Sequence, residues 1–241
     1  MIGIAIGLVG IGGVFLVPLL VATGRPLESA IGTSLETFTA TGIVATAIYG
    51  RRGAIDWRSA ALTSAGSIVG GPFGAKLSVW LPEIAVSACF AAFLIVTGAT
   101  TLVRPSVVES QRLGRAKLGW PGLVTCGVTV GVGSGLTGVG GPAILVPLLL
   151  LLKVPAGIAI GISQPNAIAA SASGAFGHLA FGRVDLPLAA LLSLCAGLGV
   201  AFGAAIHSWF NAEALRKSVG IACIILGLWL SGNLLHRLQV I

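Results

Sequence analysis

Long apolar runs alternate with short polar breaks along the whole chain. The runs cover residues 1–22, 29–50, 58–81, 84–103, 119–152, 156–180, 186–210 and 214–235. Most are about 20 residues long, the length of an α-helix that crosses the hydrocarbon core of a bilayer. We therefore predict an all-α fold, a polytopic membrane helical bundle of about eight segments.

The second half of the chain repeats the first. GLVGIGGVFLVP at residues 7–18 matches GLTGVGGPAILVP at residues 135–147. The match continues at an offset of 129 positions (185 minus 56, for example), with the pairs Asp56 and Asp185, Phe73 and Phe202, Gly74 and Gly203, Trp80 and Trp209, and Gly98 and Gly227. We predict two homologous four-segment repeats, 1–103 and 119–241, with glycine-broken first helices and a basic linker at 104–118. Such halves are typical of secondary transporters.

Composition supports lipid as the main solvent of the chain. Hydrophobic residues make up 56% of it and charged residues only 9%, whereas soluble domains carry about 25% charged residues. The net charge of +7 does not indicate nucleic-acid binding, because the basic residues lie in short loops and form no recognisable binding module. The four cysteines lie in four different apolar runs and do not have the spacing of metal ligands. We predict no nucleic-acid partner, metal or other cofactor.

The basic residues also suggest an orientation, if each apolar run spans once. Nine then fall on one side, namely Arg51, Arg52, Arg58, Arg104, Arg112, Arg115, Lys117, Arg183 and Arg237. Five fall on the other, namely Arg25, Lys76, Lys153, Arg216 and Lys217. The positive-inside rule then places both termini and the linker of this multi-pass protein in the cytoplasm.

The run at residues 119–152 is too long for one span, and Gly-Val-Gly-Gly-Pro interrupts it at 138–142. A kinked helix, a broken helix and a re-entrant hairpin all fit this pattern. An additional crossing here would make the two halves inverted rather than parallel, and the residues leave that choice open.

The glycine breaks are the first candidate site. Gly12 and Gly13 in the first half correspond to Gly140 and Gly141 in the second. A helix that begins at Val14 or at Pro142 would point its free N–H groups and the positive end of its dipole into the membrane interior. Two such helix starts can bind an anion without a buried cation. Close helix packing is the simpler alternative, but we favour a site because the breaks recur in both halves.

Two other glycine patterns have structural interpretations. Small-residue ridges at Gly66, Gly70 and Gly74, and at Gly127, Gly131 and Gly135, favour close helix packing. Residues 133–138 match G-x-G-x-x-G, but no strand precedes them and no acidic residue follows at the required distance, so we exclude a dinucleotide site.

Polar side chains open the second apolar run of each half. Ser34 and Ser163 occupy equivalent positions, and Gln164 and Asn166 follow in the second half. Such groups either replace part of an ion's water shell or bond their own helix's carbonyls. The serines fit both alternatives, whereas the two amides are expected to face a cavity.

Glu36 is a charge placed near the middle of a predicted span. A carboxylate there by default marks an ion or proton path, so we assign it a proton-coupling role. A buried structural hydrogen bond and a shifted helix boundary are the alternatives. For His178 and His207 we favour packing over proton transfer.

These motifs resemble those of the sulfite exporter TauE/SafE family. The resemblance rests on GLVGIGGVFLVPLL with AIGTS at residues 30–34, and on GLTGVGGPAILVPLLLLL with AIGIS at residues 159–163. It implies an inner-membrane carrier that exports sulfite, sulfonates or related sulfur anions. Where the family often has a third glycine, this chain has Val14 and Pro142.

The sequence therefore predicts a secondary transporter of a small anion that works by alternating access. Gly12, Gly13, Gly140 and Gly141 would hold the anion. Ser34, Ser163 and Asn166 would donate hydrogen bonds to it, and Gln164 would also line the site. Its partners are the anion and the lipid bilayer, and a homo-oligomer is compatible with the sequence. A non-transporting accessory or scaffold protein is the main alternative. We find no catalytic motif and predict no enzyme activity.

Overall fold

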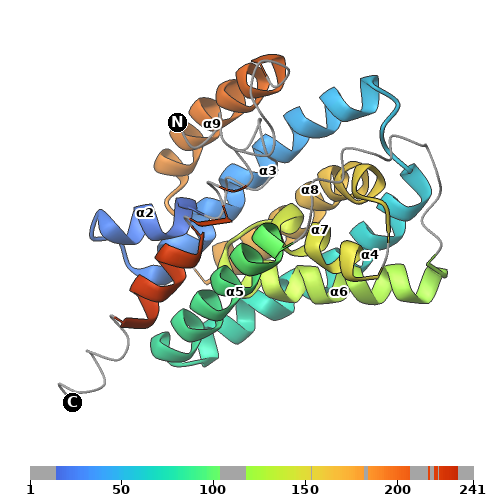
Figure 1. Ribbon diagram of the computed structural model, residues 1–241. Helices are drawn as coiled ribbons and strands as arrows, with labels where there is room; N and C mark the ends of the chain where they lie inside the picture. The colour runs from blue at the N-terminus through green and yellow to red at the C-terminus, as the bar shows by residue number, and fades with distance from the viewer. Residues whose placement is uncertain are drawn as a thin grey trace.

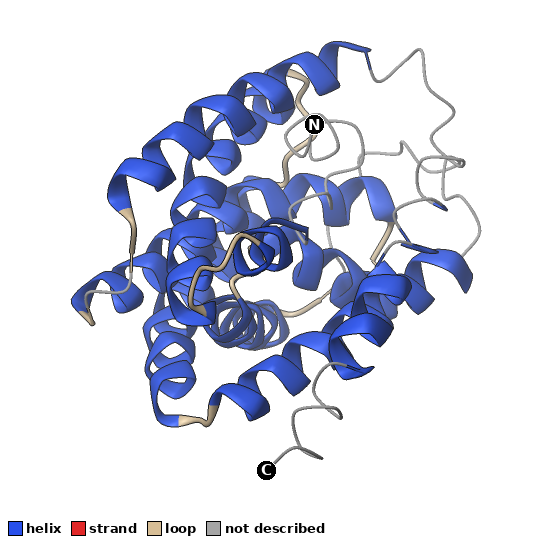
Figure 2. Cartoon of the chain, turned by 90° about the vertical axis from the view of Figure 1, so that its left-hand side faces the viewer, coloured by secondary structure: helices blue, strands red, loops and turns tan. Residues whose placement is uncertain are grey.

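The described part of the chain is helical throughout. The computed structural model describes residues 15–103, 118–152, 154–181, 184–206, 217, 220–221 and 223–232. The helices are α2 (Leu16–Ala22), α3 (Leu27–Arg51), α4 (Trp57–Trp80), α5 (Glu83–Val103), α6 (Trp120–Thr137), α7 (Gly141–Leu151), α8 (Ala156–Ala180) and α9 (Leu186–Ile206) (Figure 1). Residues 223–232 are also helical, and helices with short connections make up all the described structure in Figure 2. The predicted all-α class is confirmed.

Several helix bounds lie within a few residues of those predicted. Helix α3 replaces the predicted run 29–50, α4 replaces 58–81 and α8 has the predicted bounds. Within the described residues, no helix combines the length and the apolar character that crossing a membrane requires.

Helices α4 and α6 pack backbone against backbone through the two glycine ridges. A Cβ atom added to Gly66, Gly70 or Gly74 would lie 2.2, 2.4 or 2.2 Å from the carbonyl oxygens of Val124, Val128 and Val132, respectively. Since both series ascend along the chain, α4 and α6 run parallel. Only glycine permits so close an approach, so the predicted packing role of the ridges is confirmed.

Helix α8 crosses the same core beside α4 and α3. It runs parallel to α4, because Asn166 bonds Ser67 while Gly177 packs against Pro72 and Ala75. It runs antiparallel to α3. Gly42 packs against Ile168, and Gly174 against Leu35 further back along α3. Helices α4, α6 and α8 therefore share one direction, and α3 has the opposite one.

The predicted run 119–152 is a hairpin. The start of α7 lies at the middle of α8, where a Cβ on Gly141 would be 3.1 Å from Ala167 Cα. Its other end lies near the start of α8, since only residues 152–155 separate the two helices. Helix α7 thus runs antiparallel to α8 and to α6. Of the three alternatives left open by the sequence, the structure shows the hairpin, in which the chain reverses its direction.

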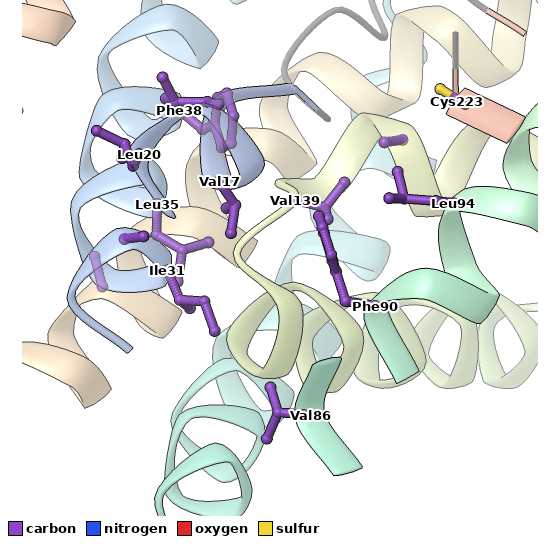
Figure 3. Close-up of a cluster of buried hydrophobic side chains, with 14 residues drawn as sticks. Val17, Leu20, Ile31, Leu35, Phe38, Val86, Phe90, Leu94, Val139 and Cys223 are labelled. Atoms are coloured by element: carbon purple, nitrogen blue, oxygen red, sulfur yellow. The ribbon is translucent and has the colours of Figure 1, made fainter. Parts of the chain in front are cut away.

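A buried apolar cluster holds the α6–α7 connection in place. Val139 from this connection is 3% exposed and belongs to the same buried cluster as Val17 of α2, Leu35 of α3 and Phe90 of α5 (Figure 3). Side chains from four separate parts of the chain therefore fix the position of the break.

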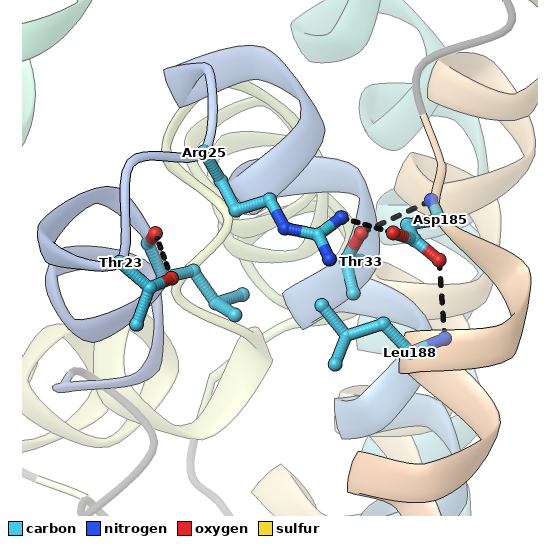
Figure 4. A network of polar contacts seen from close by, with 6 residues as sticks. Thr23, Arg25, Thr33, Asp185 and Leu188 are labelled. Carbon is cyan, nitrogen blue, oxygen red and sulfur yellow. Dashed lines mark hydrogen bonds and ion pairs between the residues drawn. The ribbon is translucent and has the colours of Figure 1, made fainter.

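The two ends of the bundle differ in charge. At one end, the last turn of α3 and the start of α4 carry Arg51, Arg52 and Arg58, and the first turns of α8 lie there too, because Gly161 contacts Ala54. We call this the Arg51 end. At the opposite end, Arg25 forms an ion pair with Asp185 at the start of α9 (Figure 4).

The start of α9 is fixed at this Arg25 end by further bonds. The Asp185 amide donates to Thr33 Oγ1 of α3 at 3.2 Å, and its carboxylate caps α9 by accepting from the Leu188 amide at 3.1 Å. The Asp56 carboxylate caps α4 in the same way, at Ser59.

Candidate functional site

The chain breaks between α6 and α7 through two glycines with left-handed backbones. Gly138 has φ of 73° and ends α6, its amide donating to Ser134 O at 2.8 Å. Gly140 has φ of 82° and immediately precedes α7. Residues with a Cβ rarely adopt such angles, so both positions favour glycine. The helix predicted to start at Pro142 begins one residue earlier, at Gly141.

The first turn of α7 points free backbone donors into the core. An α-helix leaves its first four N–H groups without intrahelical partners. Pro142 has no N–H, so the donors at this end are the amides of Gly140, Gly141 and Ala143. No side chain caps this end of α7, and Gly140, Gly141 and Ala143 are all buried. The positive end of the α7 dipole therefore lies inside the bundle.

Helix α3 covers one side of this helix start. A Cβ on Gly140 would be 3.0 Å from the ring of Phe38, so the ring lies directly over that glycine. Ser34, one turn earlier, donates through Oγ to Gly138 O at 2.8 Å and shares the same hydrogen with Ile31 O. Ser34 therefore bonds its own helix, as one of the two sequence interpretations expected, and also contacts the break. Its predicted role in binding an ion stays a prediction.

Helix α8 covers the other side with Asn166. This side chain is 0% exposed, and its Oδ1 lies 2.8 Å from the position of a Cβ on Gly141. Its Nδ2 donates to Ser67 Oγ of α4 at 2.8 Å, and Ser67 Oγ donates in turn to Gly127 O of α6 at 2.8 Å. This relay joins three helices beside the start of α7.

The relay fixes which face of the amide meets Gly141. Ser67 has one hydroxyl hydrogen, which the Gly127 carbonyl takes, so toward Asn166 it can only accept. Asn166 must therefore turn its NH₂ to Ser67 and its oxygen to Gly141. That oxygen has no hydrogen-bond partner among the described residues. Asn166, which we expected to donate to an anion, instead presents an acceptor.

Ser163 and Gln164 bond within their own helix. Ser163 Oγ donates to Ile160 O at 2.7 Å, and Gln164 Nε2 donates to Ile160 O and to Ser163 Oγ, both at 3.1 Å. They lie on α8 on the Arg51 side of Asn166. Since α3 and α8 are antiparallel, Ser34 and Ser163 lie toward opposite ends of the bundle, so the fold does not bring these equivalent residues together.

Glu36 lies on α3 away from the glycine break. Its neighbours Ser34 and Phe38 both face the break, and residues two apart on a helix point in different directions. Glu36 is partly exposed at the tenth residue of this 25-residue helix. The structure thus separates it from the α7 start while keeping it near mid-helix.

The glycine break of the first half precedes α2 in the sequence. Gly12 and Gly13 lie outside the described residues. Helix α2 begins at Leu16, and Val17 in its first turn contacts the break, since a Cβ on Gly138 would be 3.0 Å from Val17 Cγ2.

Sequence reasoning missed Ser67, which has no polar counterpart in the other half because Ala196 stands there. The available signal was its position inside a glycine ridge. His178 has the packing role that we favoured: it is 0% exposed, and its Nε2 is 2.8 Å from Gly135 O in the last turn of α6.

The fold and site define a helical bundle with a discontinuous helix pair at its centre. The sequence profile of the family described as "Sulfite exporter TauE/SafE" matches residues 1–230. The chain belongs to the sulfite exporter TauE/SafE family.

Two curated relatives match over nearly their whole length. A "Probable membrane transporter protein YdhB" of Bacillus subtilis is 26% identical, and the match covers 95% of this chain and 96% of the relative. A "Probable membrane transporter protein MJ0441" of Methanocaldococcus jannaschii is 25% identical, with 95% and 91% covered. No solved structure matches the chain significantly.

Proposed function

We propose that this chain is a membrane-embedded secondary transporter that exports a small sulfur oxyanion, sulfite or a sulfonate, by alternating access. The observation that carries the proposal is the buried start of α7. Its free amides and dipole form an anion-binding arrangement deep in the bundle. Family membership and the relatives' printed names support transport, and the family description supports the class of substrate.

The anion in this proposal binds between Gly140, Gly141 and the middle of α8. Ser34 supports the site through Gly138, and Ser163 and Gln164 line the same helix toward the Arg51 end. The Phe38 ring covers Gly140, so the anion reaches the amides only when α3 and α7 separate at this point. That separation is the local event that alternating access requires here.

Lipid as the surrounding solvent is part of the proposal. Large apolar side chains are exposed along the bundle surface, including Val69 at 70%, Phe176 at 71% and Leu198 at 74%. The helices that carry these side chains, α4, α8 and α9, would face lipid acyl chains, because exposed apolar surface on this scale is unusual in water.

An inverted repeat is also part of the proposal. Helices α3 and α8 occupy equivalent places in the two halves and are both 25 residues long. Each is preceded by a proline with φ of −56° and ψ of 140°. Because the two helices run antiparallel, we propose halves of inverted topology rather than parallel ones.

The charge of the two ends supports an orientation. The Arg51 end carries Arg51, Arg52 and Arg58, whereas the Arg25 end pairs its arginine with Asp185. We assign the Arg51 end to the cytoplasm by the positive-inside rule. The linker joins the bundle there, since α6 begins beside the start of α4.

The last described segment of the chain packs beside α5. Gly220 packs on Leu102, and Gly227 packs on Ile95 and Ala91, so residues 220–232 run antiparallel to α5. Helix α5 begins at the Arg25 end, two residues after α4. Residue 232, the last described residue, therefore lies toward the Arg25 end.

The test is sulfite transport in proteoliposomes by Gly140→Leu and Gly141→Leu variants. A leucine at either position fills the space beside the amides, so transport should fall at least about tenfold. Gly232→Leu is the matched control, because nothing lies within 4 Å of its Cβ position. Full transport by correctly folded Gly141→Leu would remove the site. Absence of transport and of anion-induced thermal stabilisation in the unmutated protein would favour the accessory-protein alternative.

A further inference from the structure

The start of α7 presents both hydrogen-bond donors and a hydrogen-bond acceptor. An anion without hydrogens cannot pair with both. The amides of Gly140, Gly141 and Ala143 are donors and attract negative charge. Asn166 Oδ1, which faces Gly141, is an acceptor and carries negative partial charge. An anion seated on the amides with only lone pairs to offer would meet that oxygen with repulsion.

The acceptor is built into the fold. Asn166 is fully buried, and within the part of the chain that the structure describes its Oδ1 has no hydrogen-bond partner. Rotating the amide by 180° would relieve the repulsion but would set Oδ1 against Ser67 Oγ, whose only hydrogen is donated to Gly127 O. The Asn166–Ser67–Gly127 relay therefore holds the oxygen toward Gly141. A buried polar atom left unpaired is costly, which favours a ligand that supplies a donor.

We propose that the site selects oxyanions that carry their own hydrogen-bond donor, in the form of a protonated oxyanion or an anion with an adjacent hydroxyl or ammonium group. This inference rests on the proposed function, since it specifies the ligand of the same site. The α7 amides bind the anionic oxygens, and Asn166 Oδ1 accepts the ligand's hydrogen. Ser67 acts as a positioning residue, because its hydroxyl bonds Asn166 and the α6 backbone.

Two sulfonates of equal charge separate this selection from anion binding in general. Hydroxymethanesulfonate carries an O–H donor and methanesulfonate does not. Isothermal titration of the purified full chain should give about tenfold tighter binding of hydroxymethanesulfonate, the value of one hydrogen bond to an otherwise unpaired acceptor. For sulfite itself, affinity should fall as rising pH converts hydrogen sulfite to the dianion.

Two variants assign the preference to Asn166. Asn166→Leu removes the acceptor, so the two sulfonates should bind within about threefold of each other. Ser67→Ala leaves Asn166 in place but frees its amide to rotate, and should also reduce the preference below about threefold. This milder variant keeps the proposal testable if Asn166→Leu fails to fold. Thr63→Val is the control, because it removes a buried hydroxyl that bonds only its own helix, and it should keep the full preference.

The outcomes distinguish the two proposals. Equal binding of both sulfonates by the unmutated protein overturns the donor requirement and leaves the anion site standing. A preference that persists in both Asn166→Leu and Ser67→Ala overturns the role of Asn166. If neither sulfonate nor sulfite binds, the proposed function fails and the donor requirement fails with it.

Discussion

Arg25 and Asp185 form an ion pair across 160 positions of sequence, joining the turn before α3 to the start of α9. The Asp185 pKa lies below its ordinary value of 3.8, first because the Arg25 side chain donates a hydrogen bond to the carboxylate and second because the Leu188 amide does so. The ionised carboxylate is thus favoured in the folded protein.

This pair predicts a specific acid sensitivity. Because the pKa is lowered on folding, the contribution of Asp185 to stability is complete above 3.8 and is lost as pH falls through the folded-state pKa. The melting temperature of Asp185→Asn should therefore fall less than that of the unmutated protein between about pH 5 and pH 3. Arg25→Gln should have the same effect, and the double variant should add little. Parallel pH profiles for all four proteins would contradict this assignment.

The contact between α4 and α6 predicts a severe effect of a single methyl group. A Cβ on Gly127 would lie 2.0 Å from Thr63 O, so Gly127→Ala must push two backbones apart. We expect a loss of about 1–3 kcal/mol in unfolding free energy, measurable by thermal denaturation in detergent.

Gly197→Ala on α9 is the matched control for this methyl group. Its Cβ would meet only Val44 Cγ2 at an ordinary 3.8 Å, and alanine favours a helix over glycine. Its stability should be unchanged or slightly raised. An equal loss in the two variants would mean that helix propensity, and not the close approach, sets the cost.

The hydroxyl of Ser34 predicts a difference between two equivalent serines. Ser34→Ala removes the bond to Gly138 O across the α6–α7 break, leaving a buried carbonyl without that donor, and should cost about 1 kcal/mol. Ser163→Ala loses only bonds within its own helix, one to Ile160 O and one from Gln164 Nε2, and should cost less. Thermal denaturation of the two variants measures the difference, and equal costs would argue against a role for Ser34 in holding the break.

Glu36 tests coupling separately from binding. A carboxylate near mid-helix in a membrane bundle is expected to carry protons or ions, so Glu36→Gln should abolish the dependence of transport on a pH gradient. Because Glu36 points away from the α7 start, equilibrium anion binding should be retained. Transport with an unchanged pH dependence would eliminate the coupling role.

Local patterns were sufficient to predict much of the helical arrangement. The bounds of α8, the ridge contacts of Gly66, Gly70 and Gly74, and the helix start beside Pro142 all follow from residues close together in sequence. Glycine spacing and proline position determine backbone geometry directly, so these features can be read without knowing which helices meet.

Features that depend on contacts between distant residues could not be predicted in this way. Ser67 and Asn166 are 99 positions apart, and nothing local to either indicates the other. The amide orientation of Asn166 depends on a third helix, through Gly127. The chain reversal inside 119–152 is another such feature, because it exchanges the ends of every later helix and periodicity alone does not reveal it.

The glycine contact between α4 and α6 also limits how the molecule can move. Two backbones in direct contact have no flexible side chains between them that could adjust if one helix slid along the other. These two helices should therefore move as one rigid unit. By contrast, α3 meets the α6–α7 break through the ring of Phe38 and the hydroxyl of Ser34, which can both change rotamer. We therefore expect α3 to move relative to the α6–α7 break during the transport cycle, while α4 and α6 stay fixed relative to each other.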